Sequence, residues 1–194
     1  LARKGGGLVT LGSETSGGIR HVLATDLVAR HTDNGLRIKS ATTRGGTIED
    51  IYFRNCTMDS VKNVFSFTLN WNPAYSYSEL PKGIKYDSIP AHWKSMLHKV
   101  EPVEKGIPHA KDVYVDNLRV TNAQNVFTAT GLEQSLLTNF VYNNSNISAD
   151  VMGVLEFTRA WKYNNMVFTI QKNKMAPKPQ ASEIEEGQKN QTHE

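Results

Sequence analysis

The sequence has one cysteine, no long apolar run and no cluster of basic residues, and each absence excludes a class of protein. Cys56 is the single cysteine among 194 residues, so an internal disulfide and a cysteine-rich metal site are excluded. We expect Cys56 to be a small buried hydrophobic residue. No apolar run approaches the roughly 20 residues that a membrane helix needs, so no membrane partner is expected. Lysine and arginine are scattered, which argues against nucleic-acid binding.

The charge balance and the histidines give no sign of a cofactor. The net charge of +3 would suit an anionic substrate, although a small excess of this kind is usually a matter of solubility. None of the six histidines pairs with another at a metal-ligand spacing. The sequence therefore predicts neither a metal site nor a cofactor.

The beginning of the chain carries neither a methionine nor a visible signal peptide. Residues Leu1 to Gly7 have no apolar stretch behind their charges, and a secretory signal requires one. We therefore expect a fragment that is truncated on its N-terminal side. The localisation cannot be judged from this end of the chain.

A short pattern recurs along the sequence, consisting of a polar residue, alternating apolar positions and a closing Asn or Asp. Neighbouring copies lie 26 to 29 residues apart, except where an insertion separates the second copy from the third. Each copy has the period of two that is typical of a half-buried strand. The copies are His21–Asp26, Asp50–Asn55, Asp112–Asn117, Asn139–Asn144 and the incomplete Asn165–Phe168.

A second alternating run follows in most units, and no segment with helical periodicity separates the runs. We align Leu36–Lys39, Phe65–Thr68, Phe127–Thr130 and Leu155–Thr158. Short strands in units of this length predict an all-β parallel β-helix with stacked coils. Val22, Ile51, Val113 and Phe140 should then form one interior column, while Asp26, Asn55, Asn117 and Asn144 share one corner. A sandwich of the same strands is the alternative.

The predicted domain covers residues 1–173, with a loop insertion at about 70–109 and a disordered tail at 174–194. Five prolines exclude a regular central strand from the insertion, and long loops in compact domains are commonly functional. Trp71 and Trp93 could stack on sugar rings or could anchor the loop, and the sequence favours neither. The tail is polar and rich in Pro and Glu, which indicates disorder.

The alternation places Arg37 and Lys39 on the outer surface of one strand, about 7 Å apart. Following coils should continue this surface with Ser66 and Thr68, Thr128 and Thr130, and Glu156 and Thr158. Arg binds a carboxylate in a bidentate manner and Lys adds a compact charge, so the surface could bind an acidic carbohydrate. A solvated polar face is the simpler interpretation of the same pattern.

Four segments stand in a distinctive order, namely Gly12–Gly18, Gly35–Ser40, Arg44–Gly46 and Ile51–Asn55. Together they resemble one block of the polygalacturonase-type enzymes, the pectin-degrading hydrolases of glycoside hydrolase family 28. Arg37-Ile38-Lys39 resembles a family motif whose Arg and Lys bind a uronic acid carboxylate. The resemblance is strong over residues 5–70, looser to residue 172, and does not cover the tail.

This resemblance implies a right-handed, single-stranded parallel β-helix of the pectin-lyase-like kind, taken from its C-terminal portion. It also implies hydrolysis of α-linked galacturonic acid with inversion, in which Arg37, Lys39 and Glu14 bind substrate. The family's catalytic Asp motifs precede this block and have no counterpart here, and Gly6 stands where the family has a His. We considered Glu14, Asp26, Asp33, Asp50 and Glu156 as carboxylates, and we assign catalysis to none of them.

We interpret the chain as part of a polygalacturonase-like enzyme that acts on pectic polysaccharide outside the cytoplasm, and we expect a monomer. The fragment alone should be inactive. An inactive carbohydrate-binding β-helix module is one alternative. A pectate-lyase-like enzyme is less favoured, because it would need Ca²⁺ and a cluster of carboxylates that the sequence does not show.

Overall fold

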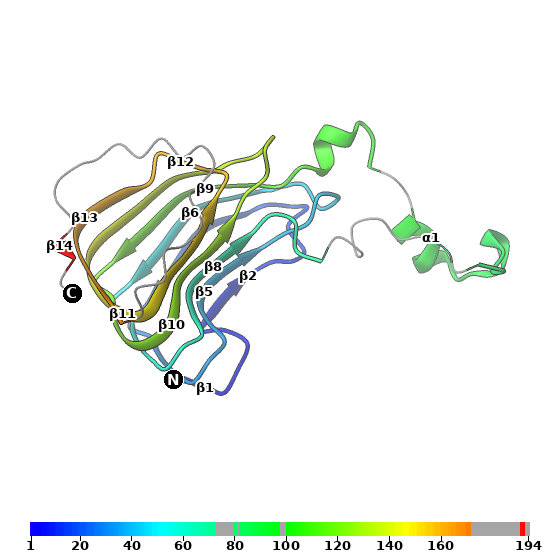
Figure 1. Ribbon diagram of the computed structural model, residues 1–194. Helices are drawn as coiled ribbons and strands as arrows, with labels where there is room; N and C mark the ends of the chain where they lie inside the picture. The colour runs from blue at the N-terminus through cyan, green and yellow to red at the C-terminus, as the bar shows by residue number, and fades with distance from the viewer. Residues whose placement is uncertain (73–79, 81, 98–99, 172–190, 193–194) are drawn as a thin grey trace.

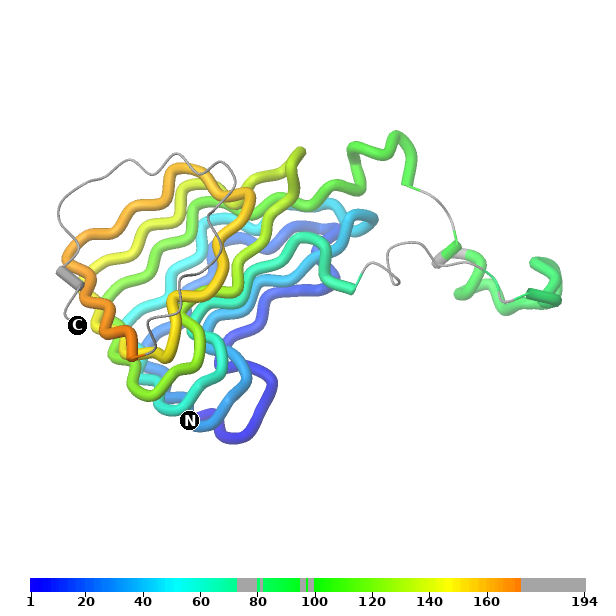
Figure 2. Tube along the Cα trace, viewed as in Figure 1, coloured from blue at the N-terminus to red at the C-terminus, as the bar shows by residue number. Residues whose placement is uncertain are grey.

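The chain folds into a right-handed parallel β-helix (Figure 1), which confirms the predicted fold class. The structure is a computed structural model that describes residues 1–72, 80, 82–97, 100–171 and 191–192. All pairs between its named strands are parallel. The coils follow one another from the blue end to the orange end of the trace (Figure 2).

Each coil contributes strands to three faces. Face 1 contains β3 (Ile19–Thr25), β6 (Thr47–Arg54), β9 (His109–Asp116) and the start of β11 (Leu137–Glu156). Face 2 contains β1 (Ala2–Arg3), β4 (Val28–Arg30), β7 (Thr57–Asp59) and the start of β10 (Arg119–Thr130). Face 3 contains β2 (Val9–Leu11), β5 (Asn34–Lys39), β8 (Asn63–Thr68) and the ends of β10 and β11. The last coil adds β12 (Thr158–Arg159), β13 (Lys162–Ile170) and β14 (Gln191–Thr192).

The predicted interior column on face 1 is confirmed by the register of the strands. Val22 pairs with Ile51, Ile51 with Val113, and Val113 with Phe140. The last three are at most 1% exposed, and Val22 packs against them from the open first coil. Because side chains alternate along a strand, this register sends every second residue outward.

Aromatic rings fill the interior of the later coils. Phe65 stacks on Phe127 with 5.3 Å between ring centroids, and Phe140 stacks on Trp161 at 4.8 Å. Tyr142 is fully buried among these rings, and burial raises its pKa well above the ordinary value. The core is thus a continuous stack along the coil axis, with each ring packed on rings of neighbouring coils.

The residues predicted at one corner adopt the left-handed backbone conformation. Asp26, Asn55, Asn117 and Asn144 have φ angles of 57°, 52°, 53° and 48°. The amide of Asn117 donates to Oδ1 of Asn55 at 2.9 Å, whereas the amide of Asn144 donates to Asp116. Asn and Asp tolerate this conformation better than other non-glycine residues, so these types suit the corner.

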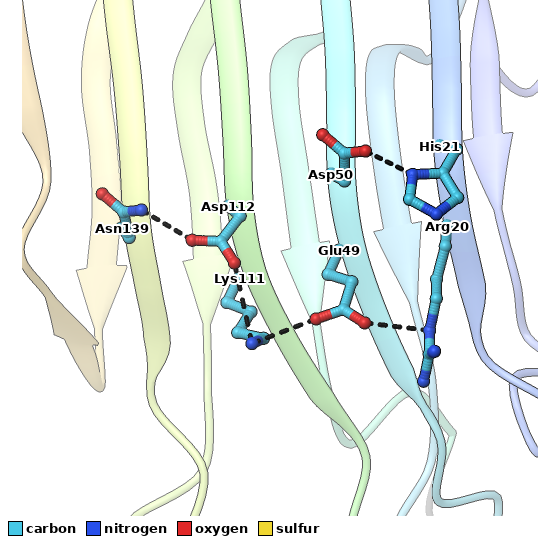
Figure 3. A network of polar contacts seen from close by, with 7 residues as sticks. All are labelled: Arg20, His21, Glu49, Asp50, Lys111, Asp112 and Asn139. Atoms are coloured by element: carbon cyan, nitrogen blue, oxygen red, sulfur yellow. Dashed lines mark hydrogen bonds and ion pairs between the residues drawn. The ribbon is translucent and has the colours of Figure 1, made fainter.

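A second row of left-handed residues lies within the strands of face 1 (Figure 3). The ring of His21 and the carboxylate of Asp50 form a hydrogen bond, and the side-chain amide of Asn139 donates to the carboxylate of Asp112 at 2.6 Å. Beside this row, Arg20 and Lys111 both bind Glu49, at 2.9 and 3.0 Å. These groups satisfy one another across neighbouring coils, so we regard the network as structural.

The described residues of the insertion between β8 and β9 form short helices and no named strand. The helices are η2 (Tyr86–Ser88), α1 (Ala91–Leu97) and η3 (Val103–Gly106). Figure 1 shows α1 standing away from the coils, and the Trp93 residue on α1 is 46% exposed. The insertion returns to the coils where the Gly45 amide donates to the Gly106 carbonyl at 2.9 Å.

The sequence pattern did not predict α1, because seven residues are too few for a helical period to be visible. In the described residues, no helix has the length and hydropathy needed to span a membrane. Most of residues 174–194 lie outside the described residues, so the prediction of a disordered tail stays a prediction.

Replacing Phe127 with Ala should lower the free energy of unfolding by about 3–5 kcal/mol, because it leaves a cavity in the aromatic stack. Phe127 is 0% exposed and contacts the rings of Phe65, Tyr142 and Trp161. Urea unfolding followed by circular dichroism measures the change. Leu23→Ala is the control, because Leu23 is 60% exposed and should change stability by about 0.5 kcal/mol or less. Equal losses in both variants would contradict this view of the core.

Two surface carboxylates should make stability depend on pH. The pKa of Asp50 is lowered by hydrogen bonds from His21 and then Tyr52, and that of Asp59 by Asn122 and then Thr121. The folded pKa values lie below the unfolded value of about 3.9, so both groups stabilise the fold above about pH 4. That stabilisation is lost as the pH falls through the folded pKa values.

The double variant Asp50→Asn, Asp59→Asn should therefore show a smaller drop in Tm between about pH 6 and about pH 3 than the wild type. Thermal unfolding at both pH values measures it. Asp33→Asn removes an exposed carboxylate that has no side-chain hydrogen bond in the described part of the chain, and it serves as the control. A double variant with the wild-type drop would disprove the assignment.

Candidate functional site

The outer surface of face 3 brings Arg37 and Lys39 into two parallel columns. In β5, Leu36 and Ile38 are 0% exposed, and Arg37 and Lys39 alternate with them toward solvent. The arginine column contains Thr10, Arg37, Ser66, Thr128 and Val154, which are paired in register. The lysine column contains Lys39, Thr68, Thr130 and Glu156 in the same way. The predicted outward placement of Arg37 and Lys39 agrees with this geometry.

The predicted alignment of the last coil is wrong by two positions. Gly153, not Leu155, pairs with Phe127, so Glu156 pairs with Thr130 and follows Lys39 in the lysine column. Thr158 is buried at the start of β12 and belongs to neither column. A shorter corner accounts for one of the two positions, because the offset between paired residues of β10 and β11 falls from 27 at Val120 to 26 at Ala123.

Arg37 is held between neighbouring strands with part of its guanidinium group out of water. Its Nε atom is buried and has no hydrogen-bond partner among the described residues. Within that same part of the chain, no carboxylate lies within ion-pair distance of Arg37 or Lys39. A buried donor without a partner is unusual in a folded protein.

Lys39 lies against the first aromatic residue of the insertion. Its Nζ atom is 4.1 Å from the centroid of a Trp71 ring, and the Trp71 amide donates to the Ser40 carbonyl at 2.7 Å. This cation–π contact orients the ammonium group at the end of the strand. Trp71 is thus placed beside the lysine column, whereas Trp93 lies on α1. Of the two tryptophans weighed in the sequence, Trp71 is the one beside the site.

Glu14 lies in the turn that follows β2, at the end of face 3 where Lys39 ends β5. Its side chain is 77% exposed and is 3.9 Å from Nη2 of Arg44. The hydroxyl of Ser13 donates to both oxygens of this carboxylate, at 3.2 and 3.3 Å. Such an exposed carboxylate can accept hydrogen bonds from sugar hydroxyls.

The glycine-rich turns around Glu14 are needed for close packing. A Cβ atom on Gly12, which has φ of 93°, would lie 1.9 Å from the Lys39 carbonyl oxygen. The hydroxyl of Thr15 contacts the Ser40 hydroxyl at 2.6 Å and donates to the Gly45 carbonyl at 2.9 Å. These contacts bind the turn after β2 to the turn after β5, and so they position Lys39 and Glu14 at the same end of face 3.

The other carboxylates considered in the sequence lie elsewhere. Asp26 is at the corner after β3, Asp33 precedes β5, and Asp50 belongs to the network of face 1. Among the described residues, no group of three His, Cys, Asp or Glu side chains could hold a metal ion.

Gly6 and a Ser–His pair were also tested as site residues. Gly6 lies in the turn between β1 and β2, and a Cβ atom there would meet no atom within 4 Å. Sequence reasoning missed the contact of Ser135 with His109, whose Oγ and Nδ1 atoms are 2.9 Å apart. The Ser135 hydroxyl donates to the Pro108 carbonyl at 2.7 Å. Its proton is therefore used in a structural bond, and the pair is no activated nucleophile.

Comparisons with known proteins relate much of this chain to pectin-degrading enzymes. The family model described as glycosyl hydrolases family 28 matches residues 3–90. A Vitis vinifera protein named probable polygalacturonase is 39% identical over 107 residues, which are 52% of this chain and 21% of that protein. An exo-poly-alpha-D-galacturonosidase of Dickeya chrysanthemi is 28% identical over 178 residues, covering 90% of this chain and 27% of that protein.

A solved structure supports the fold. The family 28 exopolygalacturonase of Yersinia enterocolitica superposes with a TM-score of 0.64 at 21% identity, covering 93% of this chain and 28% of that one. The chain thus spans about a quarter of the length of these relatives. The block around Arg37-Ile38-Lys39 lies inside the matched residues 3–90, and the coil stack is shared. Over residues 3–90 the chain therefore resembles the glycosyl hydrolases of family 28, and it shares the fold of a family 28 enzyme.

Proposed function

We propose that this chain supplies substrate-binding residues to a pectin-degrading glycoside hydrolase that cleaves α-linked galacturonic acid. The observation that carries the proposal is the pair Arg37 and Lys39 on the outer surface of face 3. Neither forms an ion pair within the part of the chain that the structure describes. Two cations that pair with no carboxylate among the described residues, followed by small hydroxyl residues, form a surface suited to an anionic sugar chain.

Arg37 and Lys39 would contribute in different ways to the binding of one sugar carboxylate. Arg37 offers a planar fork to the two carboxylate oxygens, while Lys39, about 7 Å further along the strand, adds a point charge. Trp71 limits the positions that the Lys39 ammonium group can take. Ser66 and Thr128 follow Arg37 at the spacing of the coils, and their hydroxyls can bond the next sugars.

The proposed reaction is hydrolysis with inversion of configuration. One carboxylic acid protonates the glycosidic oxygen, while a carboxylate on the other side of the ring activates water. We assign neither group to Asp26, Asp33 or Asp50, because these residues lie away from the outer columns of face 3. We likewise assign neither to Glu14 or Glu156. The role proposed for this chain is to hold the substrate, and we expect the chain by itself to be inactive.

An inactive carbohydrate-binding module is the second candidate, and one observation favours it. Gly6 occupies the position where the family resemblance places a His, and the space around a Cβ atom at Gly6 is open. Packing therefore does not require glycine at this position. In this second candidate, face 3 binds a pectic chain in the same way but no cleavage follows. In both, we propose action outside the cytoplasm, where pectic polymers occur, by a monomer.

The proposal is tested by Arg37→Ala and Lys39→Ala, each measured for binding of a galacturonate oligomer by calorimetry. Each charge-assisted bond contributes roughly 1.5–3 kcal/mol, so each variant should bind at least about tenfold more weakly. The methyl-esterified oligomer is the control ligand, because it lacks the negative charge. Its binding should change far less in both variants.

Equal losses on the charged and the esterified oligomers would contradict the proposal, since they would mean that Arg37 and Lys39 support the fold and do not recognise the carboxylate. Ser66→Ala is a matched control on the next coil, because it changes the same surface without removing a charge. Reducing-sugar release from polygalacturonate by the chain alone, abolished by a substitution within it, would contradict the proposed lack of a catalytic pair.

A further inference from the structure

The lysine column begins with a cation and ends with an anion. Lys39, Thr68, Thr130 and Glu156 are paired in that order on β5, β8, β10 and β11, which lie side by side in Figure 1. Glu156 is exposed, and within the described residues no Lys, Arg or His lies within ion-pair distance of it. The hydroxyl of Thr130 donates to Oε2 of Glu156 at 3.4 Å. This contact directs the carboxylate toward the column.

The two charges are far enough apart to act on different sugars. Neighbouring coils are about 4.8 Å apart, so Glu156 stands roughly 14 Å from Lys39 along the column. The Debye length at physiological ionic strength is about 8 Å. Screening therefore confines the repulsion by Glu156 to the sugar above the fourth and fifth coils, while Arg37 and Lys39 attract a carboxylate on the second coil.

At the end where Glu156 closes the lysine column, the arginine column closes with an apolar residue, Val154. Val154 pairs with Thr128 and follows the hydroxyl residues Ser66 and Thr128 along that column. The surface thus changes from two cations, through small hydroxyls, to an anion beside a valine. A free carboxylate would meet repulsion from Glu156 and no hydrogen-bond donor from Val154.

We propose that Glu156 is a specificity residue that excludes a free carboxylate from the sugar bound at the far end of face 3. This inference rests on the proposed function, in which Arg37 and Lys39 bind a galacturonate. The favoured ligand is a pectic segment with one free galacturonate over Arg37 and Lys39 and an uncharged sugar over Val154 and Glu156. That sugar is either a methyl-esterified galacturonate or a neutral sugar. Discrimination comes from repelling the wrong ligand as well as from attracting the right one.

The test measures the affinity of Glu156→Gln for three oligomers of equal length by calorimetry at low ionic strength. The oligomers are a fully de-esterified galacturonate, a methyl-esterified galacturonate and one in which neutral sugars alternate with galacturonate. Glu156→Gln should bind the de-esterified oligomer about fivefold more tightly than the wild type does. The gain should disappear at about 1 M salt. The wild type should bind either the methyl-esterified oligomer or the oligomer with neutral sugars more tightly than the other. The tighter of the two identifies the kind of uncharged sugar that face 3 accepts beside Glu156.

Asp26→Asn is the matched control, because it also removes one negative charge but lies at the corner after β3. Asn55 and Asn117 occupy the same corner on the next coils, so the substitution fits the local backbone. Asp26→Asn should leave all three affinities unchanged. An equal gain in both variants would show a general effect of net charge and would overturn the inference.

Two results separate this inference from the proposed function. If Arg37→Ala and Lys39→Ala weaken galacturonate binding while Glu156→Gln changes nothing, the inference fails and the proposed function stands. If Glu156→Gln weakens binding of the de-esterified oligomer, Glu156 accepts a bond from the substrate, and the exclusion role is overturned. If Arg37→Ala and Lys39→Ala have no effect on any oligomer, the proposed function fails first and the inference fails with it.

Discussion

The register between neighbouring coils is the constraint on which the rest of this structure depends. A slip of one residue would exchange the inner and outer side chains of a strand. On face 3, the pairing of Leu36 with Phe65 and of Phe65 with Phe127 keeps apolar residues inside. The same pairing leaves Arg37, Ser66 and Thr128 outside in one row. The orientation of the binding surface is therefore a consequence of core packing, and the polar residues themselves need few contacts to hold it.

The sequence predicted the fold well because its two main signals are local. The period of two within each strand and the recurring Asn or Asp at the corner both survive in a single sequence, and both have a direct physical cause. The outward placement of Arg37 and Lys39 follows from the first signal alone. Their proposed role in binding comes from a family resemblance, which the period of two could not supply.

The predictions failed where a local pattern does not determine the structure. Leu155 looked like the partner of Phe127 because both begin an alternating run. Gly153 takes that place, and a corner that is one residue shorter accounts for part of the difference. Gly153 has φ of 85°, and a Cβ atom there would lie 1.9 Å from the Phe127 carbonyl oxygen. A glycine has no side chain, so it does not count as an apolar position in an alternating pattern, and the alignment therefore did not use Gly153. The placement of Glu156 beside Thr130 depended in part on this one corner.

The connections between the faces explain why the candidate site lies where it does. The connections from β3 to β4, from β6 to β7 and from β9 to β10, which join face 1 to face 2, contain two residues each. Those from β4 to β5 and from β7 to β8, which join face 2 to face 3, contain three each, and β10 and β11 continue through their corners without a break. From face 3 to face 1, the connections after β2, β5 and β10 contain six or seven residues, and the one after β8 contains forty because it holds the insertion. Short corners with left-handed residues are constrained by the next coil, whereas longer ones can vary without disturbing the register.

All of these variable connections leave face 3 at the end where Lys39 stands, and they include Glu14, Arg44 and Trp71. The outer columns of face 3 are rigid because the core holds them, and the residues at their end are free to differ. A rigid row of charges beside variable loops is the arrangement in which one scaffold can bind a polymer and adjust which sugars it accepts. Under the proposed function, the opposite charges of Lys39 and Glu156 would then limit how far along the coils a uniformly acidic chain can lie.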